Sequence, residues 1–149
     1  MNLPKRKTVF MAAYIAVACL AHIVLFRNKV NTDIPVVFRL LFALAAIAIT
    51  LLLHELIHGF FMKLLGMKNV KIQFAKDRTG LPSLRTAADG QLFGAKRILV
   101  LMAPFVLLTV IPDVIFVFSN RVELFFFIAA LCNAAGCCFD VMDVLNLQS

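Results

Sequence analysis

Charged side chains are scarce in this sequence. Only 15% of its 149 residues are Asp, Glu, Lys or Arg, whereas about 25% is usual for a soluble domain. Hydrophobic residues make up 62% of the chain, and the mean hydropathy is +0.95. This composition excludes an ordinary soluble domain and indicates an integral membrane protein.

Trp is absent, Tyr occurs once and Phe occurs 15 times. Phe suits a lipid-facing chain, but without Trp the sequence offers no aromatic belt that would mark the membrane boundaries. The four cysteines lie within apolar runs, and no two of them have the C-x-x-C spacing of a zinc ribbon or redox pair. We therefore expect buried thiols that pack as small apolar side chains.

The sequence shows no internal repeat, no low-complexity segment and no clear cleavage site after its first apolar run, which we therefore interpret as a retained anchor. The net charge of +7 does not indicate nucleic-acid binding, because the basic residues are not interleaved with aromatic residues on a polar face. They cluster between apolar runs instead, as membrane topology signals do. We expect no nucleic-acid partner.

Four apolar runs are each long enough to cross a hydrocarbon core of about 30 Å. They cover residues 8–26, 36–65, 98–118 and 123–145. Pro104 and Pro112 should kink or break the third run, and Gly66 should cap the end of the second. We predict an all-α membrane protein whose residues 1–149 form a single integral-membrane domain.

Residues 67–97 are the one sizeable polar segment, between the second and third runs. Val70–Phe74 alternates apolar and polar residues, which is typical of a strand. A turn at residues 77–80 and a returning strand at residues 84–86, weakened by Pro82, would complete a short β-hairpin. The hairpin would either cover the neighbouring helices or offer a strand edge to an extended substrate.

Basic residues indicate the orientation of the chain. Eleven of the 15 Lys and Arg residues lie on the side of the N-terminus and of residues 67–97, and four lie on the other side. The excess of positive charge in short cytoplasmic segments predicts that both termini and the hairpin are cytoplasmic. We expect a protein of the plasma membrane, in contact with the lipid bilayer.

The second apolar run ends in His54-Glu55-Leu56-Ile57-His58, which matches the pattern H-E-x-x-H. Chance would produce this pattern in roughly 5 of 10,000 chains of the same composition. On a helix, His54 and His58 lie on one face and can bind the same zinc ion, and Glu55 is close enough to act as a base on water bound to the metal. The alternative is that both histidines are polar residues hydrogen-bonded inside a helix bundle.

A catalytic zinc ion usually has three protein ligands. His54 lies about 27 Å into the second run, and Asp140 lies about 26 Å into the fourth, which enters from the same side. Asp140 is therefore our choice for the third ligand, with Asp143 one turn deeper as the runner-up. Two cysteines in the same run, at positions 137 and 138, are further alternatives.

Asn133 lies two turns before Asp140 on the same helix face. Its amide would either hydrogen-bond a substrate carbonyl or oxyanion, or make a structural bond between helices. His22 and Asp113 lie toward the outer end of their runs, so we expect structural roles for both. Arg39 is near the outer interface, where its side chain can extend into the headgroups.

These motifs together resemble the DUF3267 family of putative zincin peptidases, which is similar to the site-2-protease type of intramembrane metalloprotease. The resemblance covers roughly residues 40–147. It is carried by the H-E-x-x-H-G motif at 54–59, the K-L-L-G at 63–66, the Ala-Pro at 103–104 and the stretch from Asn133 to Asp140. It implies zinc ligands at His54, His58 and Asp140 and a catalytic base at Glu55.

The leading hypothesis is a membrane-embedded zinc metallopeptidase in which Glu55 activates a zinc-bound water. Its substrates would be membrane or membrane-proximal proteins. One alternative is a metal-binding scaffold or regulator without proteolytic activity. Another is a small transporter subunit, but such a protein should have polar residues through the whole membrane depth, whereas here they gather at one level.

Overall fold

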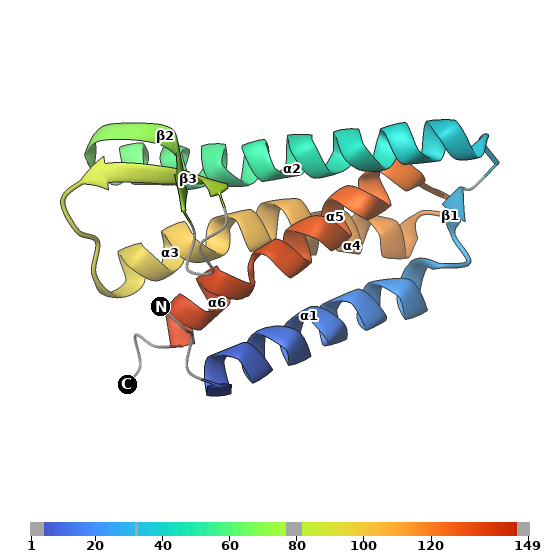
Figure 1. Ribbon diagram of the computed structural model, residues 1–149, viewed down its shortest axis with the longest axis horizontal. Helices are drawn as coiled ribbons and strands as arrows, with labels where there is room; N and C mark the ends of the chain where they lie inside the picture. Colours follow the sequence, from blue (N-terminus) through green and yellow to red (C-terminus); the bar gives the residue numbers. More distant parts are fainter. Residues whose placement is uncertain (1–4, 32, 77–81, 146–149) are drawn as a thin grey trace.

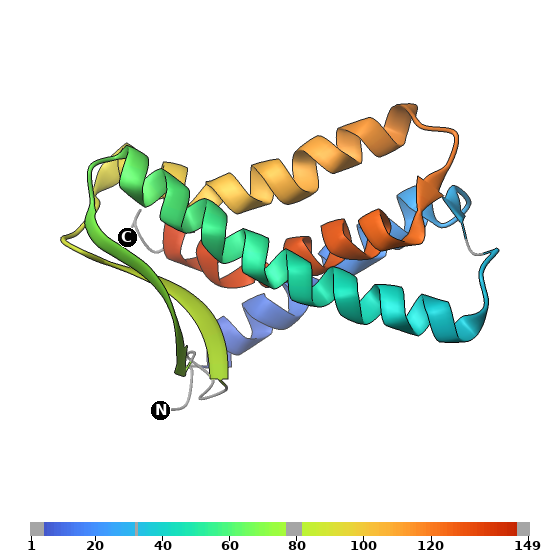
Figure 2. The ribbon, with the colours of Figure 1, turned by 90° about the horizontal axis from the view of Figure 1, so that it is seen from above.

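The computed structural model describes residues 5–31, 33–76 and 82–145. Four long helical rods run along the molecule in alternating directions (Figures 1 and 2). All four are long and apolar enough to cross a membrane. The rods are α1 (Lys5–Phe26), α2 (Val36–Leu64), a third made of α3 (Gly94–Phe105), the π-helix η1 (Val106–Val110) and α4 (Ile111–Phe118), and a fourth made of α5 (Leu124–Gly136) and α6 (Cys138–Leu145). The predicted fold is confirmed, although the third rod begins at Gly94 rather than Ile98.

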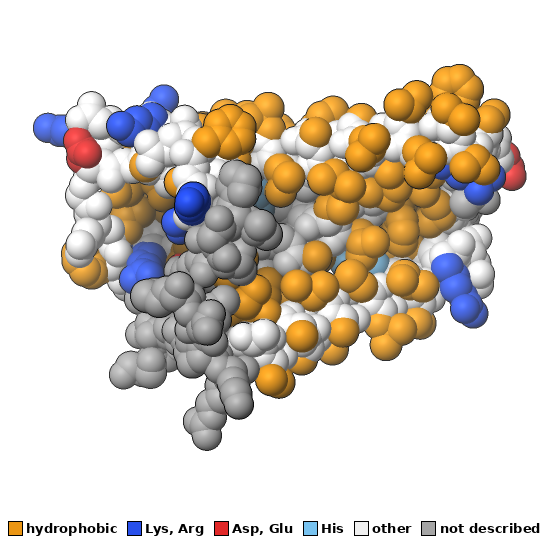
Figure 3. Space-filling model, in the orientation of Figure 1, with side chains coloured by type: hydrophobic (Ala, Val, Ile, Leu, Met, Phe, Trp, Pro, Cys, Tyr) orange, Lys and Arg blue, Asp and Glu red, His pale blue; other side chains and the backbone are white. Residues whose placement is uncertain are grey.

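The outer faces of these rods are apolar. Leu40, Leu44 and Leu51 of α2 each keep more than half of their surface exposed. Figure 3 shows hydrophobic side chains over the middle of one face, with Lys and Arg toward its two ends. A continuous apolar surface of this kind would be costly in water, so it fits a chain surrounded by lipid.

At the end of the molecule opposite the hairpin, a small hydrophobic core joins three rods. It contains Phe26, Phe116, Val122 and Ala130, and the rings of Phe26 and Phe116 meet edge to face at 5.7 Å. Here β1 (Val30–Asn31) pairs in parallel with β4 (Val122–Glu123). Neither strand was predicted from the sequence, because two-residue strands give no periodic signal.

The third rod contains both prolines without losing its helical course. Between Pro104 and Pro112 the backbone passes through η1, where the N–H of Ile111 bonds to the carbonyl of Val106 five residues earlier. Instead of the expected kink or break, the backbone hydrogen bonds change from four-residue to five-residue spacing within η1. Pro104 has no N–H, so the carbonyl of Val100 has no helical donor at that position.

The fourth rod is interrupted at Cys137, between α5 and α6. Cys137 has ψ near 0°, and its carbonyl accepts from the N–H of Val141 at 2.9 Å, which keeps the chain turning in the same sense. Apolar composition alone predicted one continuous run here. The interruption places Asp140 in the first turn of α6.

The hairpin consists of β2 (Lys68–Lys76) and β3 (Pro82–Asp89), paired antiparallel. Both strands are longer than predicted, and the predicted turn at residues 77–80 lies outside the described residues. Gly66 ends α2 as expected: it has φ +85°, and it and Met67 donate to the carbonyls of Lys63 and Met62. This is a Schellman cap, and it turns the chain from α2 into β2.

The hairpin packs directly over Gly59 of α2. A Cβ at this position would lie 3.5 Å from side-chain carbons of both Val70 in β2 and Thr86 in β3. The hairpin therefore lies against the last turns of α2, beside the H-E-x-x-H motif (Figure 2).

Candidate metal centre

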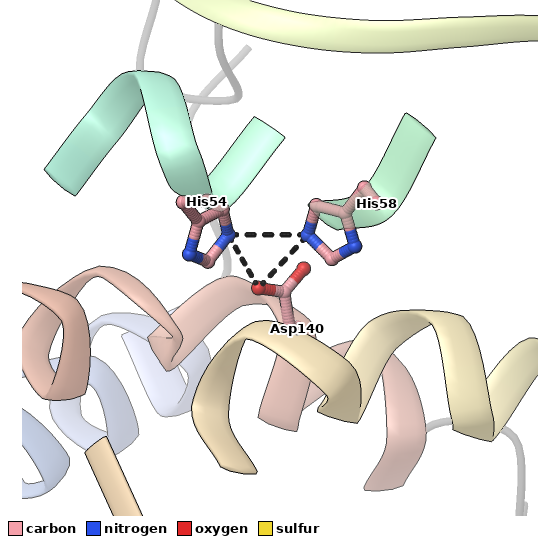
Figure 4. A group of neighbouring side chains, drawn as sticks. All are labelled: His54, His58 and Asp140. Carbon is pink, nitrogen blue, oxygen red and sulfur yellow. Dashed lines mark hydrogen bonds and ion pairs between the residues drawn. The ribbon is translucent and has the colours of Figure 1, made fainter. Parts of the chain in front are cut away.

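Three side chains from two rods meet at the hairpin end of the bundle (Figure 4). His54 and His58 project from one face of α2, as their spacing of four residues requires, and Asp140 comes from α6. The Nε2 atoms of the two histidines are 3.1 Å apart. Oδ2 of Asp140 lies 3.1 Å from Nε2 of His54 and 3.6 Å from Nε2 of His58.

These distances fit the edges of a metal coordination polyhedron. Zinc binds imidazole nitrogen at about 2.0–2.1 Å and carboxylate oxygen at a similar distance. Two ligands of a tetrahedral zinc ion are then about 3.3 Å apart. The three observed separations bracket this value, so the residues can hold such an ion with little movement.

The hydrogen bonds of the imidazole rings show which atoms face one another. Nδ1 of His58 donates to the carbonyl oxygen of Val100 at 2.9 Å, and Nδ1 of His54 donates to Oδ1 of Asn133 at 2.9 Å. Both partner oxygens are acceptors, so both protons lie on Nδ1, and each Nε2 presents a lone pair. Two lone pairs and a carboxylate oxygen thus converge at contact distance, an arrangement that a cation would stabilise.

The donor set also has the partners typical of metal ligands. Metal-binding histidines usually donate their second N–H to a carbonyl or carboxylate, which fixes the ring. Val100 and Asn133 supply these acceptors here. Exposed fractions are 13% for the side chain of His54, 8% for His58 and 15% for Asp140, so little water competes for the ligand atoms.

Asn133 is fully engaged within the bundle. It is only 2% exposed, and its Nδ2 donates to the carbonyl of Pro104 and to Oγ1 of Thr109, both at 2.9 Å. Its Oδ1 accepts from His54. The sequence analysis placed this residue at the site and left open whether it touches a substrate or bridges helices. In the structure, its amide joins the fourth rod to the second and third.

Glu55 is held by β3. The backbone N–H of Thr86 donates to Oε2 of Glu55 at 2.6 Å, and the hydroxyl of Thr86 donates to the backbone carbonyl of Glu55 at 2.7 Å. The sequence analysis missed this contact, as well as the one between His58 and Val100. The spacing of Pro104 from Val100 was a usable signal, since it frees that carbonyl, but no sequence pattern points to Thr86.

A cavity of about 280 Å³ opens beside two of the three ligand candidates, His54 and Asp140. His54 and Glu55 line it from α2, residues 83–85 from β3, and Gly136 and Asp140 from the fourth rod. Glu55 therefore lines the same cavity as two of the three metal-binding candidates, His54 and Asp140. A base that acts on water near a metal must border the same space as the metal, and Glu55 meets this condition.

The alternative ligands are not among the three side chains whose ligand atoms converge. Asp143 lines the cavity but does not belong to the group of three. Sγ of Cys137 is 3.9 Å from Nδ1 of His54, on the side of the ring away from Nε2. Sγ of Cys138 contacts the carbonyl of Met11 in α1 at 4.0 Å. Nε2 of His22 lies 3.1 Å from Oδ2 of Asp113, far along the bundle from this site.

The family comparison agrees with this geometry. A family model described as "Putative zincin peptidase", DUF3267, matches residues 47–149, which include all three ligand candidates and Glu55. No curated protein and no solved structure gave a match. Because the match covers well over half of the 149 residues, the chain belongs to the DUF3267 family of putative zincin peptidases.

Proposed function

We propose that this protein is a membrane-embedded zinc metallopeptidase of the H-E-x-x-H type, similar to site-2 proteases. It would hydrolyse peptide bonds of membrane or membrane-proximal proteins. The observation that carries the proposal is the convergence of Nε2 of His54, Nε2 of His58 and Oδ2 of Asp140 within 3.6 Å of one another, next to Glu55. Membership of the zincin peptidase family supports the same reaction class.

His54, His58 and Asp140 would hold the metal, and the cavity would leave its remaining position open to water. A zinc ion there would supply a Lewis acid and lower the pKa of a bound water to about 7. Glu55 would accept the proton from the attacking water at its carboxylate and deliver it to the leaving amine. The bond from the N–H of Thr86 orients this carboxylate before substrate arrives.

The structure suggests which strand receives the substrate. The N–H of Thr86 points away from β2, toward Glu55. In an antiparallel pair, residues two positions apart point the same way, so the backbone N–H and carbonyl of Leu84 should also face outward, where Leu84 lines the cavity. We therefore assign the substrate edge to β3 rather than to Val70–Phe74 of β2. An extended peptide paired there would bond β3 through alternate residues, and its remaining carbonyls would be free for hydrolysis.

The position of the site indicates the compartment. The ligand residues lie at the hairpin end of the bundle, where Lys and Arg residues of β2, β3 and α3 gather (Figure 3). By the positive-inside rule this end faces the cytoplasm, with both termini on the same side. Water then needs only a short path to the metal. The lipid would be that of the plasma membrane.

The test uses proteoliposomes that contain the purified protein and a solubilised membrane proteome from the cells that express it. Mass spectrometry of newly formed N-termini would identify the cleaved proteins directly, so that no single substrate has to be chosen beforehand. We expect cleavage that a chelator stops and Zn²⁺ restores. Glu55→Gln, which keeps an oxygen able to accept from Thr86, should bind zinc and lower cleavage about 10²–10⁴-fold.

Two results would count against the proposal. Undiminished cleavage by Glu55→Gln would remove Glu55 from the mechanism. Stoichiometric zinc binding without chelator-sensitive cleavage by the wild type would favour the alternative, a metal-binding scaffold or regulator.

A further inference from the structure

We propose that Pro104 is a positioning residue for the metal centre, because the proline turn of the third rod sets the proton positions on both ligand histidines. The third rod supplies no metal ligand. Its backbone instead provides one carbonyl for each histidine, directly for His58 and through Asn133 for His54. This inference rests on the proposed metal-binding function and extends it to a part of the chain outside the H-E-x-x-H motif.

The hydrogen bonds that orient the two histidines form two branches, and the first runs from Pro104 through the carbonyl of Val100 to His58. In a regular α-helix, the carbonyl of Val100 would accept from the N–H of residue 104, which proline lacks. Val100 is 2% exposed, and an unpaired carbonyl in such a place would cost about 1–3 kcal/mol. Nδ1 of His58 takes the vacant position at 2.9 Å. Since a carbonyl only accepts, the proton is held on Nδ1, and Nε2 is left with its lone pair toward the metal position.

The second branch runs from the carbonyl of Pro104 to His54. This carbonyl accepts from Nδ2 of Asn133, and Thr109 in η1 accepts from the same nitrogen. The two acceptors determine which end of the amide faces the third rod. Oδ1 of Asn133 is thereby turned toward His54 and holds the proton of that ring on Nδ1.

Burial makes this network rigid. Val100, Pro104, Thr109 and Asn133 are each at most 5% exposed, and the Thr109 hydroxyl donates to the carbonyl of Ala130 at 3.4 Å. In a dry interior an unmet donor or acceptor is expensive, so one arrangement of the network is strongly favoured. Both imidazoles then meet the metal in the tautomer that binds it, without rearrangement. Partners of this kind commonly contribute 10–100-fold to metal affinity.

The substitution that tests the first branch is Pro104→Ala, because the acceptor itself is a backbone atom. Alanine restores an N–H that competes with His58 for the carbonyl of Val100 and removes a helix breaker. We expect Zn²⁺ affinity, measured by competition with a chromogenic chelator, to fall about tenfold. Thermal unfolding of the metal-free protein should be unchanged or shifted upward. Opposite effects on affinity and stability distinguish positioning from general damage.

Pro112→Ala is the matched control. Pro112 lies in the same rod but lines an apolar groove with Leu108 and Phe125, away from the histidines. Its substitution should leave Zn²⁺ affinity within twofold of the wild type. The visible spectrum of bound Co²⁺, which reports ligand geometry, should change in Pro104→Ala and stay as in the wild type in Pro112→Ala.

A pair of variants at Thr109 tests the second branch. Thr109→Val keeps the shape but removes the hydroxyl that fixes Asn133, so we expect a severalfold loss of Zn²⁺ affinity and a shifted Co²⁺ spectrum. Thr109→Ser keeps the hydroxyl and should restore both. This pair also decides the question if Pro104→Ala fails to fold.

The outcomes separate this inference from the function on which it rests. Failure of the wild type to bind Zn²⁺ or Co²⁺ stoichiometrically would overturn the metal centre itself. A wild type that binds both ions, beside Pro104→Ala and Thr109→Val proteins with unchanged affinities and spectra, would overturn the positioning role and leave the metal centre in place.

Discussion

Two pairs of His and Asp residues lie inside this bundle, and their donor atoms are the same distance apart. Nε2 of His54 is 3.1 Å from Oδ2 of Asp140 at the hairpin end, and Nε2 of His22 is 3.1 Å from Oδ2 of Asp113 nearer the other end. The inner pair has a second histidine within reach and a cavity beside it. Within residues 5–31, 33–76 and 82–145, no third ligand-type side chain joins the outer pair.

The surroundings of the two rings also differ. Nδ1 of His22 bonds to the carbonyl of Ala18 in its own helix, and the ring of Phe26 stands 6.1 Å away. Nδ1 of His54 is held by a residue of another rod, itself anchored on a third. The outer pair therefore links α1 to α4. The inner histidines are instead oriented by hydrogen bonds to residues of the third and fourth rods. Of these two His–Asp pairs in the described residues, the inner one alone has a third ligand-type side chain and ring partners from other rods.

The largest expected effect is the difference in Zn²⁺ affinity between variants of Asp140 and of Asp113. Asp140→Asn removes the charge of one metal ligand, and we expect Zn²⁺ affinity to fall more than about a hundredfold, since even indirect partners contribute 10–100-fold. Asp113→Asn should leave the affinity unchanged. Chelator competition on both purified variants measures this. Equal losses of Zn²⁺ affinity in the two variants would mean that the outer pair also affects metal binding, which would contradict the distinct roles given to the two pairs.

The next largest effect should be on the stability of the protein, when the outer pair, His22 and Asp113, is substituted. His22→Leu leaves the partly buried Asp113 carboxylate without its partner, which should destabilise the protein by up to about 3 kcal/mol. Adding Asp113→Leu should recover much of the loss, because an apolar pair can replace a buried ionic one. Thermal unfolding in detergent micelles gives the comparison. Zinc affinity should stay constant throughout, and a double variant less stable than either single variant would contradict this interpretation.

The sequence predicted which three side chains converge at the inner site, but little of what holds them there. The spacing of His54 and His58 and the matched depths of His54 and Asp140 follow from helix geometry, so those residues could be named from the sequence. The turn at Cys137 was not predicted, because the preceding Gly136 was its only mark and a single glycine is often tolerated inside a helix. The contact of Thr86 with Glu55 depends on how the hairpin folds over Gly59, a tertiary arrangement that no local pattern encodes.

A smaller effect is expected at the contact between the hairpin and Glu55, the proposed base. Thr86→Val removes the hydroxyl bond to the carbonyl of Glu55 but keeps the backbone N–H on Oε2. We expect a loss of about 1 kcal/mol in stability and a severalfold fall in kcat with little change in zinc affinity.

Gly59→Ala should be tolerated, since the new carbon meets its neighbours at 3.5 Å, whereas Gly59→Leu should push the hairpin away and lower kcat further.

The smallest effect should come from Asp143, the other acidic side chain at the cavity. Asp143 lies three residues beyond Asp140, so it shares the same general side of α6 but sits nearly one turn farther along. If Asp140 is the third ligand, Asp143→Asn should change Zn²⁺ affinity by less than about twofold while Asp140→Asn nearly abolishes binding. The same chelator competition measures both, with Asp113→Asn as the distant control. A reversed order, with the greater loss in Asp143→Asn, would move the third ligand one turn deeper and require α6 to rotate when the metal binds.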